Sequence, residues 1–213
     1  MDLEEVWRIR EEEVYPALFG TASRGIFPLA PHMFEQAGAR GADPRWMSHG
    51  VVEFEPTEAR RSWLYVTSGA SNPWWTEPEA YDPGADAGVE FMLLTTRQGD
   101  WAVAQLQRLL AFDLMLSAGH YPELKPLGVN DRVPLRAPID GAASEIRNVV
   151  LSQPLTLPSA AQLPSGRATF LTFTGITDAE LEFTKSNSVP MLIDRLAIAG
   201  AYPVTDPDRV SLV

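Results

Sequence analysis

The sequence predicts a mixed α/β fold, a single domain in which helices flank a mixed central β-sheet. Two segments indicate strands. In residues 63–68 one set of side chains (Trp, Tyr, Thr) alternates with another (Leu, Val, Ser), and residues 89–96 are apolar at nearly every position. A third segment, 100–118, carries a wide apolar face at helical spacing. A period of two is typical of a strand and a period near 3.6 of a helix. Strands and helices alternate irregularly, which favours a mixed sheet over a regular parallel one.

The N-terminal part of the chain offers one helix and one strand. Residues Asp2 to Tyr15 are expected to form an amphipathic helix with a solvated acidic face, ended by Pro16. Scattered Gly and Pro between Gly20 and Arg45 predict loops with short irregular pieces. Apolar and charged residues alternate at 51–55, and this pattern predicts a strand.

The strand at 63–68 is predicted to have two distinct faces. One face carries Trp63, Tyr65 and Thr67, and the other carries Leu64, Val66 and Ser68. A long loop is expected at 71–87, where three prolines and two tryptophans fall close together. Loops of this length are uncommon in compact domains and are often functional.

The next strand, 89–96, is expected at the centre of the sheet because it is apolar on both faces. Asp100 should cap the helix that follows, and Gly119 should end it. That helix belongs in the core, since its apolar residues form two adjacent stripes: Val103, Leu106, Leu110 and Leu114, then Leu109, Phe112 and Leu116.

The C-terminal part predicts two strands and two helices. Strands are expected at 146–151 and 169–174, joined by a connection at 154–166. Gly175 should turn the chain into a helix that begins with a capping box of Thr177 and Glu180. The last helix should run from Pro190 to Gly200, and the segments 202–205 and 210–213 could close the sheet.

Composition limits the classes of function. The 213 residues are 45% hydrophobic, enough for a sizeable core in one domain, residues 1–213. Within it, residues 1–46 are expected to form the N-terminal helix and an irregular extension. The net charge of −11 disfavours nucleic acid, because phosphate contacts need clustered Lys and Arg.

The chain has no cysteine, which excludes disulfides, thiolate catalysis and Cys-based zinc sites. The acidic N-terminus lacks the basic start of a signal peptide. No apolar run reaches the roughly 18 residues of a membrane span, so no membrane partner is expected. We therefore expect a cytoplasmic protein.

No catalytic or metal-binding pattern stands out. The three histidines, His32, His49 and His120, are scattered and none has metal-ligand spacing. His120 is the strongest of them, since it follows the core helix and Glu123 is nearby. A hydrolase or metal-dependent enzyme using these groups is the alternative function; a structural role at the helix end is the simpler interpretation.

The predicted 71–87 loop holds the candidates for binding a protein. Trp74 and Trp75 are adjacent, so on an extended segment one could face solvent, where tryptophan is enriched at binding sites. Asp82 and Asp86 could recognise a cationic group. Both pairs also have structural interpretations, as loop anchors and as loop caps. Tyr65 completes the predicted contact set.

Several short segments in a fixed order carry a resemblance to a known family. They are Tyr65–Asn72, Gly88–Thr95, Trp101 with Gln107–Phe112, Gly119–His120, Pro138–Gly141, Ser144–Ser152, Phe170–Leu181 and Ala197–Gly200. With them, residues 47–213 resemble the Suppressor of fused domain family.

That resemblance implies a mixed α/β domain with no enzymatic activity. In animals the family regulates Gli-type transcription factors by clamping an extended peptide between two domains, and this chain resembles only the amino-terminal one. Asp82 is the nearest match to an acidic residue that contacts the peptide. Bacterial members look like stand-alone domains, and some have been proposed as immunity proteins that neutralise toxins.

The expected function is therefore non-catalytic binding of a protein partner, such as a toxin or an extended peptide. Neutralisation of a toxin by a bacterial immunity protein is its most concrete form. No cofactor or metal is expected. The sequence leaves the oligomeric state open.

Overall fold

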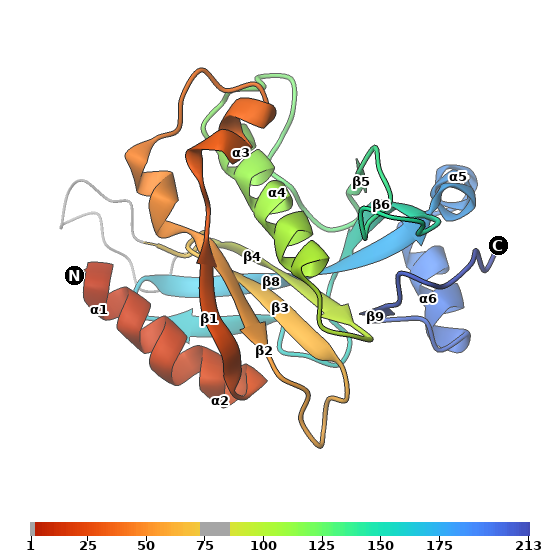
Figure 1. The fold of residues 1–213 in the computed structure, drawn as a ribbon, viewed down its shortest axis with the longest axis horizontal. Helices are drawn as coiled ribbons and strands as arrows, with labels where there is room; N and C mark the ends of the chain where they lie inside the picture. Colours follow the sequence, from red (N-terminus) through yellow and green to blue (C-terminus); the bar gives the residue numbers. More distant parts are fainter. Residues whose placement is uncertain (1–2, 73–85) are drawn as a thin grey trace.

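The computed structural model describes residues 3–72 and 86–213 (Figure 1). Within those ranges, nine strands form one mixed sheet flanked by helices, which confirms the predicted fold class. The strands are β1 (Ala22–Pro28), β2 (Gly50–Phe54), β3 (Trp63–Ser68), β4 (Asp86–Thr95), β5 (Arg132–Pro134), β6 (Ile146–Ser152), β7 (Ala160–Leu163), β8 (Gly166–Thr177) and β9 (Val204–Thr205). The helical segments are α1 (Leu3–Arg8), η1 (Ile9–Val14), α2 (Tyr15–Phe19), α3 (Pro31–Gln36), η2 (Pro44–Ser48), α4 (Asp100–Ser117), α5 (Asp178–Ser186) and α6 (Val189–Ile198).

The sheet runs in the order β1-β2-β3-β4-β8-β6-β5, with β7 paired to β8 and β9 to β4. Neighbours from β1 to β4 are antiparallel, as are β8, β6 and β5, whereas β4 and β8 are parallel. The sheet is therefore mixed because its two antiparallel halves meet at the β4–β8 pair.

Helices cover both faces of the sheet, and the alternation along β3 explains how. Tyr65 packs into the core beneath α4, while Leu64 and Val66 pack on the opposite face against α2. The C-terminal helices α5 and α6 cover that opposite face over β6 and β8. The two predicted faces of this strand are thus confirmed. No helix in the described ranges has the length and apolar character needed to cross a membrane.

The N-terminal helical segment extends past its predicted end. It continues through the π-helical turn η1 into α2 and stops at Phe19. Pro16 does not end it, because the helical segment continues through Pro16 in the first turn of α2. The expectation of irregular structure at 20–45 is also wrong, since β1 and α3 lie there.

The start of α4 differs from the prediction and its end agrees with it. Gly99 is the N-cap; Asp100 is the first helical residue and accepts a hydrogen bond from Arg24 (2.7 Å) instead of capping. At the other end, Gly119 has φ +76° and its N–H donates to the Leu116 carbonyl (3.0 Å). This is the Schellman arrangement, and glycine suits its left-handed residue.

Two further expectations for the C-terminal part are corrected. Gly175 does not turn the chain, because β8 continues through it to Thr177. There the predicted capping box is present, with Glu180 N–H donating to Thr177 Oγ1 (3.3 Å) and Thr177 N–H to Glu180 Oε2 (2.8 Å). The predicted connection at 154–166 contains β7, and residues 210–213 form no strand, whereas β9 does join the sheet.

Candidate functional site

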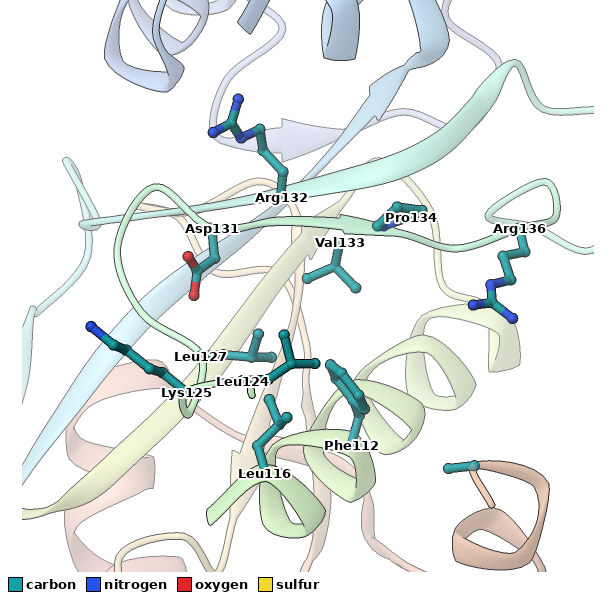
Figure 2. Close-up of a pocket in the computed structure, with 11 residues that line it drawn as sticks. Phe112, Leu116, Leu124, Lys125, Leu127, Asp131, Arg132, Val133, Pro134 and Arg136 are labelled. Atoms are coloured by element: carbon teal, nitrogen blue, oxygen red, sulfur yellow. The ribbon is translucent and has the colours of Figure 1, made fainter. Parts of the chain in front are cut away.

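An open groove of about 540 Å³ lies between α4, the chain around Leu124 and Leu127, and β5 (Figure 2). Its lining residues are Ala37, Phe112, Leu116, Leu124, Lys125, Leu127, Asp131, Arg132, Val133, Pro134 and Arg136. Figure 2 shows apolar side chains from all three segments gathered at its centre. A volume of this size is typical of sites that accept a ligand or a partner's side chains, which run from about 300 to 1,000 Å³.

Local geometry holds each wall of the groove in place. Phe112 and Leu116 are four residues apart on α4, so they share one side of the helix. The opposite wall is fixed by pairing of β5 with β6, and just beyond β5 the Leu135 N–H donates to the Arg147 carbonyl (2.8 Å). The third wall depends on Asp113, whose Oδ1 accepts the Leu127 N–H (2.6 Å).

Asp113 is an unusual anchor because its carboxyl group is buried. Burial raises the pKa of Asp113 to about 6, even though the hydrogen bond from Leu127 N–H acts in the opposite direction. The residue that attaches the 124–127 wall to α4 thus changes charge in the mildly acidic range.

Three cationic side chains stand around the groove: Lys125, Arg132 and Arg136. In the described part of the chain none of them forms an ion pair. The one acidic lining residue, Asp131, accepts a hydrogen bond from the Gly128 N–H (2.8 Å). The groove therefore has a local excess of positive charge on a protein of net charge −11.

A second feature is a buried polar cluster where β3 ends and β4 begins. Glu90 is fully buried and accepts four hydrogen bonds from residues that the structure describes. Its donors are Thr67 Oγ1 (2.6 Å), Gly69 N–H (3.1 Å), Ser71 N–H (3.0 Å) and Ser71 Oγ (2.8 Å). Because a buried carboxylate is costly without partners, these bonds fix the turn after β3 against β4.

Arg10 brings the N-terminal helical segment into this cluster. Its Nη1 donates to Ser71 Oγ (3.2 Å) and Asn72 Oδ1 (2.7 Å), and the guanidinium is fully buried. Ser71 thereby bridges Arg10 and Glu90. His49 is buried beside the same turn, and burial lowers its pKa to about 4. We call Arg10, His49, Ser71, Asn72 and Glu90 the strand-end cluster.

The strand-end cluster lies next to the segment that holds most of the predicted contact residues. Trp74, Trp75 and Asp82 are outside the described residues. Asp86 is the first residue of β4, and the structure gives the position of its backbone. A direct contact by these four residues stays a prediction.

Tyr65 is described, and it lies in the interior. Its side chain is fully buried beneath α4, and its hydroxyl accepts the Gly99 N–H (3.0 Å). Burial raises its pKa to about 12. The structure thus gives Tyr65 a packing role at the start of α4, and contact with a partner would require β3 to move.

The residues of the enzymatic alternative lie on the surface. His120 is exposed; its ring is steeply inclined to that of Trp46 (5.8 Å between centroids), and its backbone N–H donates to the Met115 carbonyl as part of the helix end. Glu123 is also exposed. Among the residues that the structure describes, no group of three or more His, Asp or Glu could hold a metal ion.

Sequence reasoning missed the groove because its three walls, which follow one another within residues 112–136, face one another only through the way the chain between them folds back. A weak signal was present in the region between α4 and β6: Lys125 is one of two lysines and stands between Leu124 and Leu127. A rare lysine between leucines could have drawn attention to this stretch.

Comparisons with known proteins place the chain among relatives. A family model for Suppressor of fused protein (SUFU) matches residues 45–210. No curated protein matches the chain. The fold resembles that in the crystal structure of a Sufu–Fu complex, with a TM-score of 0.66 and 17% identity over 99% of this chain and 91% of the other.

Two other solved structures share the fold. Drosophila Suppressor of Fused aligns with a TM-score of 0.58 and 18% identity over 77% of this chain, which corresponds to 42% of the Drosophila chain. A Suppressor of fused homologue from Neisseria gonorrhoeae aligns with a TM-score of 0.52 and 22% identity over 78% of each chain. At these identities the likeness establishes the fold.

Proposed function

Because this chain belongs to the Suppressor of fused family, we propose that it is a non-catalytic domain that binds a protein partner. The observation that carries this proposal is the groove of Figure 2, with its apolar centre open to solvent. Leu124 contributes most plainly, since 53% of its surface is exposed where a partner could cover it. A solved relative in complex with another protein, the Sufu–Fu complex, supports the same kind of role.

The groove has the features of a binding surface rather than of a reaction centre. Covering its apolar lining would favour binding by about 25 cal/mol for each Å² of apolar surface removed from water. Apolar residues at the centre with charged ones around them match the usual anatomy of a protein interface.

A selection from a displayed library of short random peptides tests this proposal. Leu124→Asp places a charge at the centre of the groove without disturbing a buried residue, so enriched peptides should lose their binding. Leu155→Asp is the matched control, because Leu155 is 65% exposed in the β6–β7 connection and does not line the groove. Peptides that bind both variants as tightly as the unaltered protein would refute a role for the groove.

The more specific form of the proposal is neutralisation of a toxin by an immunity protein. The net charge of −11 supports it, because an acidic surface accelerates encounter with a basic partner. A toxin gene beside the gene for this protein would supply the probe. Co-expression should restore growth of cells that make the toxin, and unrestored growth despite soluble expression of both would oppose the idea.

The residues predicted from the sequence form a second proposed contact region. We propose that Trp75, Asp82 and Asp86, together with Trp74, meet the partner beside the strand-end cluster. The triple substitution Trp75→Ala, Asp82→Ala and Asp86→Ala should then weaken binding of a partner with a Kd of about 10⁻⁷ M or tighter, as specific interfaces commonly have. Unchanged affinity would exclude this segment as the contact.

A further inference from the structure

We infer that the groove of Figure 2 takes a short extended segment of a partner protein in which carboxylate side chains flank an apolar one. This inference rests on the proposed function and specifies the partner's chemistry. The preference of the groove for an acidic segment differs from long-range attraction by the net charge of the protein, which would favour a basic partner. The local charge around the groove has the opposite sign to that of the protein as a whole.

Two cations of the groove, Lys125 and Arg136, form no ion pair with a described residue and can receive an anionic group. Elsewhere in the described ranges some accessible arginines are paired, such as Arg24 with Glu53 and Asp100 and Arg97 with Asp208, whereas others, such as Arg61, form no ion pair. Lys125 and Arg136 have no such partner among the described residues, although acidic residues outnumber basic ones by 28 to 17.

The positions of these cations define where the carboxylates would lie. Figure 2 shows Lys125 and Arg136 at opposite ends of the groove, with Leu124 and Phe112 between them. Asp131 stands on the Lys125 side, so the Arg136 end has the less compensated positive charge. Arg132 points away from the groove in this view, and its Nη1 lies 3.4 Å from the Thr184 carbonyl of α5. The inference therefore depends on Arg136 and, more weakly, on Lys125.

The backbone at Arg136 adds an independent observation. Its φ is +63°, in the left-handed region that residues other than glycine rarely occupy. Such conformations concentrate at functional positions, because the surrounding structure must hold them. Here the unusual backbone places a long cationic side chain at the end of the groove, immediately beyond β5.

The sheet edge explains why the occupant would be held through its side chains. The strand β5 is at the end of the sheet and is three residues long. Pro134 has no N–H to donate, so this edge cannot pair with a long added strand. Recognition would thus depend on side chains in the groove, with carboxylates held at its ends.

Three synthetic peptides with one apolar centre test the inference. They carry flanking Glu, Gln or Lys residues and are followed by fluorescence anisotropy at low and high salt. We expect the Glu peptide to bind at least about tenfold more tightly than the Lys peptide at low salt, with the difference reduced at high salt because exposed charges are screened. Arg136→Gln should weaken the Glu peptide about threefold to tenfold and leave the Gln peptide unchanged.

Arg61→Gln is the matched control, because Arg61 is exposed, forms no ion pair in the described ranges and belongs to the β2–β3 connection. It should leave all three affinities unchanged. If Gln or Lys peptides bind as tightly as the Glu peptide and Leu124→Asp abolishes that binding, the inference is wrong while the proposed function stands.

Two other outcomes would also overturn the inference. If no peptide responds to Leu124→Asp, the proposed use of the groove fails with it. A straight-chain fatty acid that binds in an Arg136-dependent manner, when no peptide does, would identify the occupant as a small amphiphile.

Discussion

Asp113 connects the groove to the interior of the domain through a single side chain. Its carboxylate holds the Leu127 N–H (2.6 Å), yet burial raises its pKa to about 6, above the ordinary value of 3.8. The folded protein therefore binds a proton at Asp113 more tightly than the unfolded chain does. Between about pH 4 and pH 6 this residue makes stability fall as the pH rises, and the loss is complete above pH 6.

We predict that Asp113→Asn stabilises the protein at pH 7. The amide oxygen can still accept the Leu127 N–H, while the cost of ionising a buried carboxyl is removed. The expected gain in the free energy of unfolding is about 1–3 kcal/mol at pH 7 and below about 1 kcal/mol at pH 4, where Asp113 is protonated in the folded protein and about half protonated in the unfolded chain. Urea unfolding at the two pH values measures it.

The exposed Asp194→Asn on α6 is the control and should show no such difference between pH values. His49 contributes a pH dependence of opposite sign, because burial lowers its pKa from 6.5 to about 4 and stability is lost as pH falls through that range. The loss of stability at low pH that His49 causes should persist in Asp113→Asn. A variant equally destabilised at pH 4 and pH 7 would contradict the prediction.

At the scale of single elements, the start of β4 depends on a close backbone approach. Gly88 has φ +125°, and a Cβ atom there would lie 2.3 Å from the Ala70 carbonyl oxygen. The turn after β3 and the start of β4 can therefore meet only if residue 88 has no side chain. This contact lies beside Ser71 and Glu90, so it also sets the geometry of the strand-end cluster.

Gly88→Ala should destabilise the domain by more than about 3 kcal/mol, since it adds both a clash with backbone and an unfavourable φ. Gly41→Ala, where a Cβ would meet nothing within 4 Å, should change stability by no more than about 0.5 kcal/mol. Guanidinium unfolding followed by tryptophan fluorescence compares the two. Equal stability of both variants would show that the backbone adjusts around residue 88.

Elements whose signals are local were predictable from the sequence. The strand at 63–68 has the same bounds in the structure, because its alternation reflects two buried faces. The helix that begins after Thr177 was found from its capping box, and Pro190 lies in the first turn of α6 as expected for a Pro-led helix. In each case neighbouring residues contain the information.

Elements that depend on distant partners were not predictable in the same way. The strand β1 has an irregularity between Ala22 and Ile26, which breaks the alternation. Its stability comes partly from Arg24, which reaches the buried carboxylate of Glu53 on β2 (2.7 Å). The groove was missed for a related reason: Phe112, Leu124 and Val133 are close in the sequence, but the course of the chain between them decides that they face one groove.

At the scale of the whole molecule, the N-terminal helical segment is part of the core. Tyr15 and Phe19 pack against Phe54 and Phe170, with ring centroids 5.4 to 6.3 Å apart. Arg10 adds the polar connection to the strand-end cluster. This segment therefore covers one face of the sheet, although the family match begins only at residue 45.

We predict that a chain lacking residues 1–20 loses its cooperative thermal transition. Removing Tyr15 and Phe19 exposes the β2, β3 and β8 side chains beneath them, and each buried aromatic lost costs about 3–5 kcal/mol. Circular dichroism during heating measures the transition, and a synthetic peptide of residues 1–20 should restore it.

A chain that lacks only residues 211–213 should melt much as the intact protein does, because those residues add no buried apolar side chain. Cooperative melting of the N-terminally shortened protein near the temperature of the intact one would contradict the prediction.

The parallel pairing of β4 with β8 has a consequence for the order of folding. The two strands are separated in the chain by α4, β5, β6 and β7. During synthesis, β1 to β4 and α4 therefore emerge from the ribosome well before the strand that completes them. Until β8 arrives, the apolar edge of β4 has no neighbour, and nonlocal strand pairs of this kind form slowly. The nascent half-sheet is thus the stage at which a chaperone would be most useful to this protein.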